Sequence, residues 1–439
     1  MFLPEYIRFC IDALEAAGFQ AWAVGGCVRD AILGLTPNDY DLCTDAMPEQ
    51  TEVVFSAHPL ILNGKKHGTV GVVLEGNVVE ITTFRTEGDY RDNRHPEWVE
   101  FVPEIEKDLA RRDFTVNAMA WSPNRGFADP FGGREDLKEK ILRAVGEPQQ
   151  RFREDSLRIL RGARFAVKYR LTPDSATEEA MTTLAPLMDN LARERVLEEL
   201  CKLLLLATAE DLLRFAPLIT QVIPELAPQL GYDQCNRHHI YDLFTHTAHV
   251  VATQPDRLHL RWAALLHDLG KPRSRTEDEK GQAHYHGHAA ISTEMAKTIL
   301  LRLKAPTAFR EQVELLIDKH MVWFPEEKKV IRRWISRLGF DTFGELIAFQ
   351  ESDCTATGTS GEMEKAHFAA IRRLMEEVKS ENTCLTLKDL AVNGHDLMAL
   401  GIRGKAIGQT LNHLLNLVLD ERIPNEKAAL LDAVQTHTP

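Results

Sequence analysis

Long hydrophobic runs are missing from this sequence of 439 residues. No segment reaches about 18 uninterrupted apolar residues, the length that a membrane-spanning helix needs. The segment that follows Met1 carries charges at helical spacing and lacks the apolar core of a secretion signal. We therefore expect a cytoplasmic protein that has no membrane partner.

Paired cysteines are also missing. The seven cysteines are scattered from Cys10 to Cys384, and none forms a CxxC pair. An odd count without such spacing excludes a disulfide framework and a thiolate zinc site. The cysteines are expected to be buried or incidental thiols.

An excess of positive charge is missing from the chain as a whole, because its formal net charge is −13. This value excludes a protein that is coated with nucleic acid over its whole surface. One stretch reverses the sign, since residues 134–170 contain eleven Lys and Arg against six Asp and Glu. Such a stretch indicates a local face on which a phosphate backbone could lie.

Two kinds of pattern divide the chain, whose length suits roughly three domains. Hydrophobic residues make up 44% and charged residues 27%, as in a folded protein. In the first part, WAVGG, DYDLCT, TVGVVL and VVEITTF are predicted strands, and a turn at residues 75–77 joins the last two. After Leu142 the pattern is helical nearly to the end. The prediction is an α+β region followed by all-α regions.

Gly25 and Gly26 lie where a predicted strand gives way to a helix, and Arg29 follows one turn later. Glycines at such a place let backbone N–H groups approach a phosphate, and the helix N-terminus adds a positive dipole. The alternative is an ordinary strand-to-helix turn in which Arg29 is a surface charge.

Asp39 and Asp41 are separated by one residue in a strand-like context. Residues i and i+2 of a strand project to the same face, about 7 Å apart, so the two carboxylates are predicted to converge. Such a pair suits phosphoryl transfer with Mg²⁺. Glu80, an acidic residue within an apolar strand, is the candidate third carboxylate. The alternatives are a polar turn for the aspartates, and solvent exposure or pairing with Arg85 for Glu80.

Taken in order, these motifs resemble a known family. GGCVRDAILG and NDYDLCT are similar to the active-site signature of bacterial CCA-adding enzymes and of the related bacterial poly(A) polymerases, which are polymerase-beta-like nucleotidyltransferases. KKHGTV, EITTFR, RRDFTVNAMA and DPFGGREDL follow at the expected spacing, and the resemblance spans nearly the whole chain. It implies a nucleotidyltransferase head with a small mixed sheet, followed by a helical neck, an HD-type body and a C-terminal tail.

The resemblance also implies roles for residues of the head. Asp39 and Asp41 would be the catalytic carboxylates that bind Mg²⁺, and Gly25 and Gly26 would hold the triphosphate together with Arg29. The metal would be shared between these carboxylates and the bound nucleotide.

Further roles are implied for the segment RRDFTVNAMA. Arg112, Asp113 and Asn117 would contact the incoming nucleotide and its ribose, by which RNA precursors are distinguished from DNA precursors. Residues 129–133 resemble the flexible element between head and neck, and an ordinary turn is the alternative.

Residues 151–170 read RFREDSLRILRGARFAVKYR and predict one amphipathic helix. Glu154, Asp155, Arg158 and Arg161 would share one face. An intrahelical ion pair between Asp155 and Arg158, worth only about 0.2–0.5 kcal/mol, is one interpretation. The other is that a carboxylate and a guanidinium side by side match the Watson–Crick edge of a base. This pattern resembles the motif by which the family selects CTP and then ATP.

Ten of the 17 histidines fall between residues 238 and 320, which predicts a separate domain. An ordered His, His-Asp, Asp series resembles the ligands of HD-type metal-dependent phosphohydrolases. Imidazoles and carboxylates suit a transition metal or Mg²⁺. The candidate ligands are His246, His267, Asp268 and Asp353, with His288 and His320 as further ones. The alternative is a helical body that only binds RNA.

The remaining motifs lie in the neck and the tail. Residues 191–195 resemble a neck motif of the family, with Ala192 where Ser is more usual. Residues 385–419 resemble the helical module that contacts the tRNA elbow, and GIRGKAIG would offer backbone amides and two cations to phosphates. A surface loop is the alternative for that segment.

The resulting prediction is a nucleotidyltransferase that adds C, C and A to the 3′ end of tRNA from CTP and ATP, with Mg²⁺ and without DNA as a partner. A second metal ion, divalent or a transition metal, is expected in the HD-type domain. The domains are predicted at residues 1–142, 143–228, 229–360 and 361–439. The alternatives are a poly(A) polymerase or an A-only or CC-only transferase, and an HD-type RNA phosphohydrolase with an accessory head.

Overall fold

A computed structural model describes residues 3–88, 98–235, 240–358, 362–381 and 384–436. The chain divides into two compact units. Unit 1 comprises Met1–Pro224 and Arg302–Lys304, and unit 2 comprises Glu225–Leu301 and Ala305–Pro439. The four domains expected from the sequence are a finer division, and their boundaries stay a prediction.

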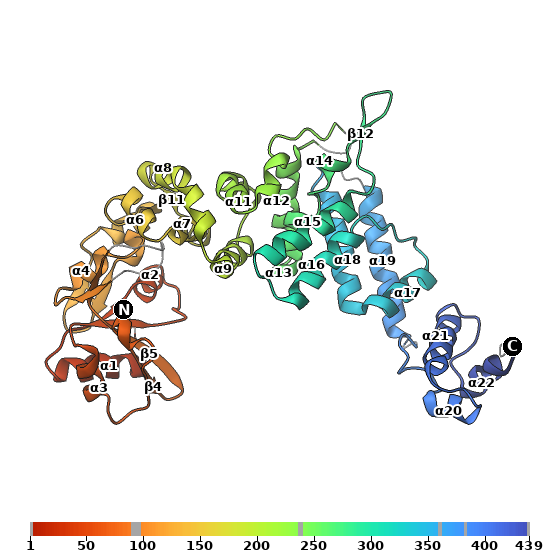
Figure 1. Cartoon of the computed structure of the whole chain (residues 1–439), viewed down its shortest axis with the longest axis horizontal. Helices are drawn as coiled ribbons and strands as arrows, with labels where there is room; N and C mark the ends of the chain where they lie inside the picture. The colour runs from red at the N-terminus through yellow and green to blue at the C-terminus, as the bar shows by residue number, and fades with distance from the viewer. Residues whose placement is uncertain (1–2, 89–97, 236–239, 359–361, 382–383, 437–439) are drawn as a thin grey trace. The chain divides into compact units, whose positions relative to one another are not determined.

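A mixed seven-stranded sheet builds the first part of unit 1 (Figure 1). The strand order is β3-β4-β5-β2-β1-β8-β9, in which β2 and β5 run parallel and the other neighbours run antiparallel. The strands are β1 (Ala21–Val24), β2 (Asp41–Thr44), β3 (Leu60–Ile61), β4 (Thr69–Leu74), β5 (Asn77–Thr83), β8 (Ala120–Ser122) and β9 (Gly126–Ala128). The predicted α+β head with a small mixed sheet is confirmed.

The hairpin between β4 and β5 forms as its sequence predicts. Leu74 pairs with Asn77, and the two residues between them, Glu75 and Gly76, have φ angles of 49° and 82°. Positive φ at both positions is typical of the tight turns whose twist matches that of a hairpin. This hairpin brings β5 beside β2.

Helices cover the sheet and continue beyond it through the rest of unit 1. The head core contains Trp22, Val24, Phe84, Ile105 and Leu109, which are buried together. The helices of unit 1 are α1 (Glu5–Ala16), α2 (Gly26–Ile32), α3 (Pro48–Val54), α4 (Ile105–Ala110), α5 (Gly133–Glu139), α6 (Pro148–Glu154), α7 (Leu157–Tyr169), α8 (Ser175–Thr183), α9 (Arg193–Leu204), α10 (Ala209–Arg214) and α11 (Ala216–Val222). Short 3-10 turns are η1 (Lys65–His67), η2 (Thr115–Asn117), η3 (Ala185–Asn190) and η4 (Pro224–Gln229). Two-residue and three-residue strands pair as β6 (Arg85–Glu87) with β7 (Val99–Phe101), and β10 (Ile141–Leu142) with β11 (Thr172–Pro173).

The single helix predicted over residues 151–170 is wrong, because the chain forms two helices there. Helix α6 ends at Glu154, Asp155 adopts extended angles (φ −139°, ψ 102°), and α7 begins at Leu157. The Asp155 carboxylate accepts a hydrogen bond from the Leu157 backbone N–H at 3.0 Å. Such a local bond competes with helical hydrogen bonds and satisfies an N–H group of the first turn of the new helix.

Unit 2 is mainly helical, as predicted, with one small exception. Strands β12 (Thr276–Glu277) and β13 (Ala283–His284) form a two-stranded pair. The first helices are α12 (Leu243–Thr253), α13 (Leu258–Leu266), α14 (Lys271–Ser274), α15 (His288–Arg302) and α16 (Thr307–Lys319). The later ones are α17 (Lys328–Leu338), α18 (Phe340–Thr355), α19 (Glu362–Ser380), α20 (Gly394–Ala399), α21 (Lys405–Leu419) and α22 (Lys427–Thr436). Helices α12, α13, α16 and α18 pack on one another, whereas the last three helices enclose a core of their own around Leu397, Leu414 and Leu430.

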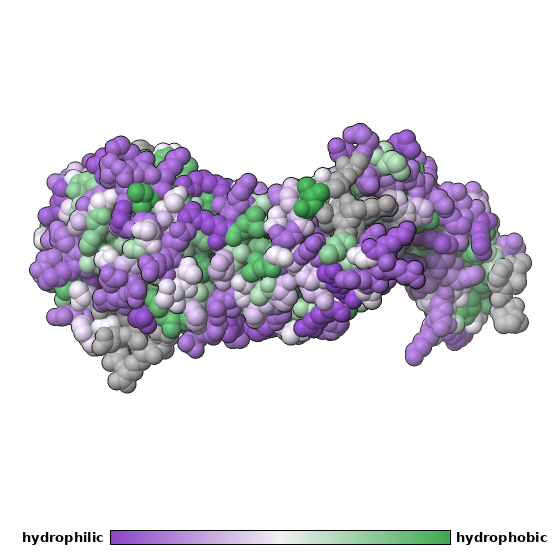
Figure 2. Space-filling view, turned by 90° about the horizontal axis from the view of Figure 1, so that it is seen from above, coloured by the Kyte–Doolittle hydropathy of each residue, from purple (hydrophilic) through white to green (hydrophobic). Residues whose placement is uncertain are grey.

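The surface is predominantly polar on the face drawn in Figure 2, where hydrophilic residues outnumber the apolar ones. Among the helices that the structure describes, none is both long enough and apolar enough to cross a bilayer.

Candidate functional site

A polar cavity of about 450 Å³ lies in unit 1. It is lined by Gly25, Gly26, Arg29, Asp41, Arg111, Arg112, Asp113, Asn117, Asp155, Arg158, Arg161, Arg164, Phe165, Lys168, Tyr169 and Arg195. Ten of these residues are candidates from the sequence, contributed by segments that lie far apart along the chain. The candidates Asp39, Glu80 and Glu154 do not line it.

The turn between β1 and α2 requires its first glycine. Gly25 has a φ of +72°, and a Cβ built on it would lie 2.6 Å from Nη1 of Arg112. A side chain at this position would therefore be strained and would displace a guanidinium that lines the cavity. Gly26 begins α2, which no described side chain caps.

The prediction that Asp39 and Asp41 share one face of a strand is wrong. Strand β2 begins at Asp41, so Asp39 lies before the strand and the two do not share a strand face. Instead, Asp41 pairs in parallel register with Glu80 of β5. Desolvation raises the pKa of the Asp41 carboxyl, Arg112 lowers it, and Asp39 raises it further. The clustering of like charges suits a bound cation, so these residues fit the implied Mg²⁺.

A buried hydrogen-bonded chain fixes the polar floor of the cavity. Arg29, only 5% exposed, donates from Nη1 to Oδ1 of Asn117, whose Nδ2 donates to Oδ1 of Asp113 at 2.9 Å. Arg161 donates from Nε and Nη2 to Oδ2 of Asp113 at 2.9 and 2.7 Å. Although burial alone would raise the pKa of Asp113, Arg161 and Asn117 hold it well below its usual range. Both oxygens of this carboxylate are thus engaged by the protein.

Helix α7 contributes cavity residues that the sequence interpretation missed. Tyr169 stacks against Arg29, whose guanidinium lies 4.1 Å from the ring centroid and donates to the phenol oxygen. Burial raises the pKa of Tyr169 to about 12, so the hydroxyl stays neutral. Arg164 and Lys168 also line the cavity. Arg164 follows Arg161 by three residues and Lys168 follows Arg164 by four, so the three lie on one helix face, a signal present in the sequence.

The candidate base-selecting residues are held by separate partners. Asp155 accepts from Nη2 of Arg195 at 3.1 Å, so the alternative interpretation, an ion pair between Asp155 and Arg158, does not apply. Arg158 instead donates to Glu154 at 2.8 Å and to the Arg111 carbonyl at 3.0 Å. The helix break accounts for this difference, because it removes the one-turn spacing between Asp155 and Arg158. Both side chains still reach the same cavity.

The segment at residues 129–133 is a helix cap in the structure. Asp129 accepts from the N–H groups of Gly133 at 2.7 Å and Arg134 at 2.9 Å, at the start of α5. A Cβ on Gly133 would lie 2.2 Å from the Thr115 carbonyl oxygen. The glycine is therefore needed for close packing of α5 on η2.

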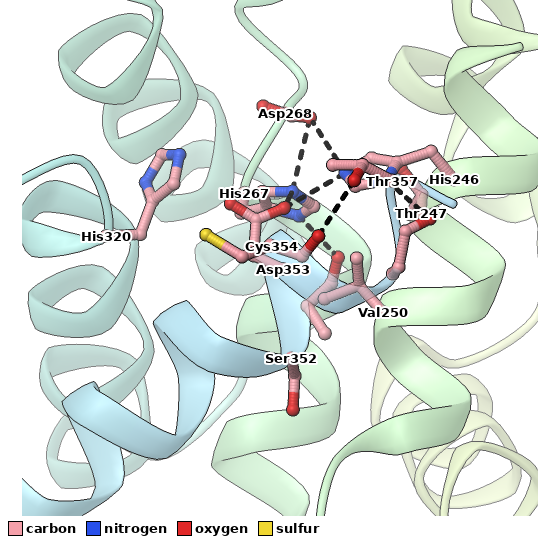
Figure 3. Close-up of polar contacts among 12 residues, drawn as sticks. His246, Thr247, Val250, His267, Asp268, His320, Ser352, Asp353, Cys354 and Thr357 are labelled. Carbon is pink, nitrogen blue, oxygen red and sulfur yellow. Dashed lines mark hydrogen bonds and ion pairs between the residues drawn. The ribbon is translucent and has the colours of Figure 1, made fainter. Parts of the chain in front are cut away.

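A second cluster of chemically active side chains lies inside unit 2 (Figure 3). His246 comes from α12, His267 and Asp268 follow the end of α13, and Asp353 comes from α18. Nε2 of His246 lies 3.0 Å from Oδ1 of Asp353 and 3.6 Å from Oδ2 of Asp268. Nε2 of His267 lies 3.2 Å from Oδ2 of Asp268 and 3.4 Å from Oδ1 of Asp353. The four predicted ligands therefore meet at one buried place.

The further candidates His288 and His320 join this cluster. Nε2 of His288 lies 3.3 Å from Oδ1 of Asp268 and 3.1 Å from Nε2 of His320. Two groups within the cluster have ligand atoms close enough for a metal ion: His246, His267 and Asp268, and Asp268, His288 and His320.

Backbone carbonyls orient all four imidazoles. The Nδ1 atoms lie 3.4, 2.8, 2.7 and 2.6 Å from the carbonyl oxygens of Ala356, Ala264, Tyr285 and Ile317, in the order His246, His267, His288, His320. A carbonyl only accepts, so each Nδ1 donates and each Nε2 faces the interior of the cluster, as in metal-binding histidines. Within the described part of the chain, both Asp268 oxygens and Nε2 of His267 are buried without a well-formed hydrogen bond.

The electrostatics of this cluster favour positive charge at its centre. Burial alone would lower the pKa of His267, yet Asp268 and Asp353 raise it to about 10. Burial would raise the pKa of Asp268, but His267 and Lys271 hold it well below its usual range. The donor set fits a divalent metal ion, which would supply the charge that these carboxylates attract.

Family models match most of the chain in three parts. Residues 21–143 match the model of the Poly A polymerase head domain. Residues 170–230 match the model named "Probable RNA and SrmB-binding site of polymerase A". Residues 279–434 match a model of tRNA nucleotidyltransferase domain 2.

Curated relatives decide the family. The CCA-adding enzyme of Streptococcus mutans is 33% identical over 441 residues, which cover 99% of this chain and 98% of the relative. The chain belongs to the family of CCA-adding enzymes. The CCA-adding enzyme of Geobacillus stearothermophilus is 47% identical over 197 residues, 44% of this chain and 48% of that enzyme.

Solved structures of CCA-adding enzymes share the fold. The Bacillus stearothermophilus CCA-adding enzyme in complex with CTP superposes with a TM-score of 0.73 at 28% identity, over 98% of this chain and 97% of that one. The Thermotoga maritima CCA-adding enzyme complexed with tRNA has a TM-score of 0.61 at 21% identity, over 99% of this chain and 95% of that one. The polymerase-type head followed by helical regions is thus a fold that these enzymes have in common.

Proposed function

We propose that this chain acts in the cytoplasm, where it adds C, C and A to the 3′ end of tRNA from CTP and ATP. The observation that carries the proposal is the composition of the unit 1 cavity. Eight cationic side chains line it against three carboxylates, and seven of the eight are arginines. A triphosphate needs such an excess of positive charge, and arginine forks bind phosphate oxygens in pairs.

Different residues would bind the triphosphate and the Mg²⁺ ion. The Gly25 turn and Arg112 would bind the triphosphate, since Nε of Arg112 is buried without an acceptor among the described residues. Asp39 and Asp41, with Glu80 beside them, would hold Mg²⁺, which when bound neutralises phosphate charge and activates the attacking hydroxyl. Asp113 would act by positioning, because Arg161 and Asn117 occupy its oxygens.

Choice of the base would rest on Asp155 and Arg158. Arg195 holds Asp155, and Glu154 holds Arg158, so an acceptor and a donor fork are presented at fixed positions in one cavity. Such a pair can form the hydrogen bonds that a template base would form with cytosine or adenine. No nucleic-acid template is then needed.

Incubation of the protein with tRNA that lacks CCA tests this proposal. We expect CTP alone to add two residues, CTP and ATP together to add three, and Asp41→Ala to slow addition at least about 100-fold. Glu106→Gln, an exposed acidic residue of α4, is the matched control and should leave the rate unchanged. Long A tails without C would indicate a poly(A) polymerase, and addition of only C or only A would indicate a partial transferase.

We propose a second activity, phosphoester hydrolysis, for the cluster in unit 2. It is supported by four imidazoles whose Nε2 atoms face the carboxylates of Asp268 and Asp353 or one another. A divalent metal held there would polarise a phosphoester and activate water. Hydrolysis of 2′,3′-cyclic phosphates at RNA ends should require His267 but not Asp41. Equal hydrolysis by the His267→Ala variant would refute this assignment.

A further inference from the structure

Arg29 is a buried cation that joins three elements of unit 1. Within α2 its guanidinium pairs with Asp30, through Nε at 2.9 Å and through Nη2 at 2.7 Å. Its Nη1 donates to Asn117 of η2, and its Nη2 donates to the hydroxyl of Tyr169, the last residue of α7. The side chain is 5% exposed, yet it lines the polar cavity. Contacts on several sides therefore fix the position of this guanidinium.

The ring of Tyr169 supplies a further contact to the same guanidinium. The guanidinium carbon of Arg29 lies 4.1 Å from the centroid of the Tyr169 ring and 5.4 Å from that of Phe165. An arginine within about 6 Å of an aromatic ring face is attracted by the ring, and the attraction is stronger where water is excluded. Tyr169 thus holds Arg29 in two ways, by stacking and by accepting a hydrogen bond.

The contacts of Arg29 leave one of its donors for a ligand. A guanidinium carries five N–H groups. Asp30 engages the one on Nε and one on Nη2, Tyr169 engages the other on Nη2, and Asn117 engages one on Nη1. The second N–H of Nη1 has no acceptor among the residues that the structure describes. A phosphate oxygen in the cavity could accept it while every protein contact of Arg29 is kept.

We propose that Tyr169 is a positioning residue for the triphosphate of the incoming nucleotide. It would act through Arg29, because its ring and hydroxyl fix the plane from which Nη1 donates. The inference rests on the nucleotide binding proposed above and adds a residue to which the sequence interpretation had given no role. Helix α7 also carries Arg158 in its first turn. The helix that contributes to choice of the base would thus also support the triphosphate.

Calorimetry on the full-length protein with CTP, CMP and inorganic triphosphate, each in the presence of Mg²⁺, tests the proposal. CMP shares the base and ribose of CTP but lacks the two outer phosphates. We expect Tyr169→Leu to weaken binding of CTP and triphosphate about 10-fold and to leave binding of CMP unchanged. Tyr169→Phe keeps the ring and should lose about 3-fold. Tyr241→Leu is the control, since Tyr241 stacks on His249 in unit 2, with ring centroids 4.7 Å apart.

The kinetics of nucleotide addition separate positioning from chemistry. In Tyr169→Leu the KM for CTP and for ATP should rise about 10-fold, while kcat stays within about twofold of the parent value. A double-mutant cycle tests the path through Arg29. In an Arg29→Gln background, Tyr169→Leu should cause no further loss of triphosphate affinity, because the group that it positions is already gone.

Each outcome supports or overturns the proposal. Unchanged triphosphate affinity in Tyr169→Leu would overturn it, and so would an equal loss for CMP, which would show that Tyr169 only supports the fold. A full further loss in the Arg29→Gln background would exclude the path through Arg29. If circular dichroism shows that Tyr169→Leu does not fold, Tyr169→Phe decides by the same comparison of triphosphate with CMP. A protein that binds triphosphate but extends no tRNA would refute the function proposed above and leave this inference standing.

Discussion

Asp113 shows how residues that line the cavity are fixed by hydrogen bonds to one another. Its Oδ2 receives two hydrogen bonds from Arg161, and its Oδ1 receives one from Asn117 and one from the Phe114 N–H. Arg29 completes the chain through Asn117. A buried carboxylate with this many donors is a rigid anchor for the two arginines that border the nucleotide cavity.

Replacing Asp113 should destabilise the protein. Asp113→Asn leaves Arg161 without its partner, and we expect a loss of roughly 3 kcal/mol in the free energy of unfolding at pH 7. The pKa of Asp113 is lowered by folding, so its contribution is present above the unfolded pKa of about 3.9 and declines as the pH falls further. Denaturant unfolding at pH 7 and pH 3.5 should show a smaller difference at the lower pH. Asp12→Asn, at an exposed position in α1, should change stability by less than about 0.5 kcal/mol.

Two glycines with the same φ allow a matched comparison. Gly25 and Gly34 both have φ of +72°, but a Cβ would meet Arg112 at Gly25 and open space at Gly34. Each Gly→Ala change should lower stability by at least about 1 kcal/mol through backbone strain, because both φ angles are positive. Only Gly25→Ala should also weaken binding of CTP and ATP, measured by calorimetry. Equal loss of affinity in both variants would contradict the role of the Arg112 contact.

At the scale of elements, the sequence predicts what is local and periodic. The β-branched runs of β4 and β5, and the turn of Glu75 and Gly76, are determined by neighbouring residues, and both predictions are confirmed. Periodicity alone did not reveal the break at Asp155. Apolar spacing continues through it, while the hydrogen bond from Leu157 to the Asp155 carboxylate ends α6.

The candidate site was predictable to a similar degree. Motif order identified ten residues of the cavity, although those residues come from segments that the sequence separates widely. The pairing of Asp155 with Arg195 and of Arg29 with Tyr169 joins different elements. Such contacts depend on packing and leave no trace in local spacing, so the sequence interpretation missed them.

Helix α9 begins without a cap and offers a test of local energetics. Its N-cap is Ala192, with extended angles (φ −57°, ψ 124°) and no side-chain hydrogen bond. Ala192→Thr should supply a hydroxyl acceptor and raise the free energy of unfolding by about 1 kcal/mol. Ala192→Val has the same shape without the hydroxyl and should give no such gain. Thermal melts of the two variants against the parent measure the difference, and an equal shift would refute the cap.

For the whole molecule, the distribution of charge matters more than its sum. The chain has a net charge of −13, yet its unit 1 cavity is lined by eight cations and three carboxylates. An acidic protein of this kind should bind RNA through a limited cationic area. The dependence of affinity on salt then reports how many phosphates are neutralised there.

Lys168 is predicted to contribute to the salt dependence of tRNA affinity. Burial lowers the pKa of this cavity lysine, and a bound phosphate would favour its charged form. Lys168→Gln should weaken tRNA binding and reduce the slope of log K against log salt by about 1. Lys107→Gln, an exposed lysine of α4 that pairs with Glu104, should leave the slope unchanged. Fluorescence titrations over a range of salt concentrations would detect the difference, and identical slopes for both variants would exclude Lys168 from the RNA contact.

The parallel pairing of Asp41 with Glu80 has a consequence for the insertion and deletion of residues. Side chains alternate between the two faces of a strand, so one extra residue in β5 before Glu80 would turn this carboxylate to the opposite face of the sheet. Two extra residues would restore the face but shift the pairing along β2. In-frame codon insertions within this strand should therefore be tolerated far less than in the exposed turn at Glu75 and Gly76, where length can change without altering which acids are neighbours.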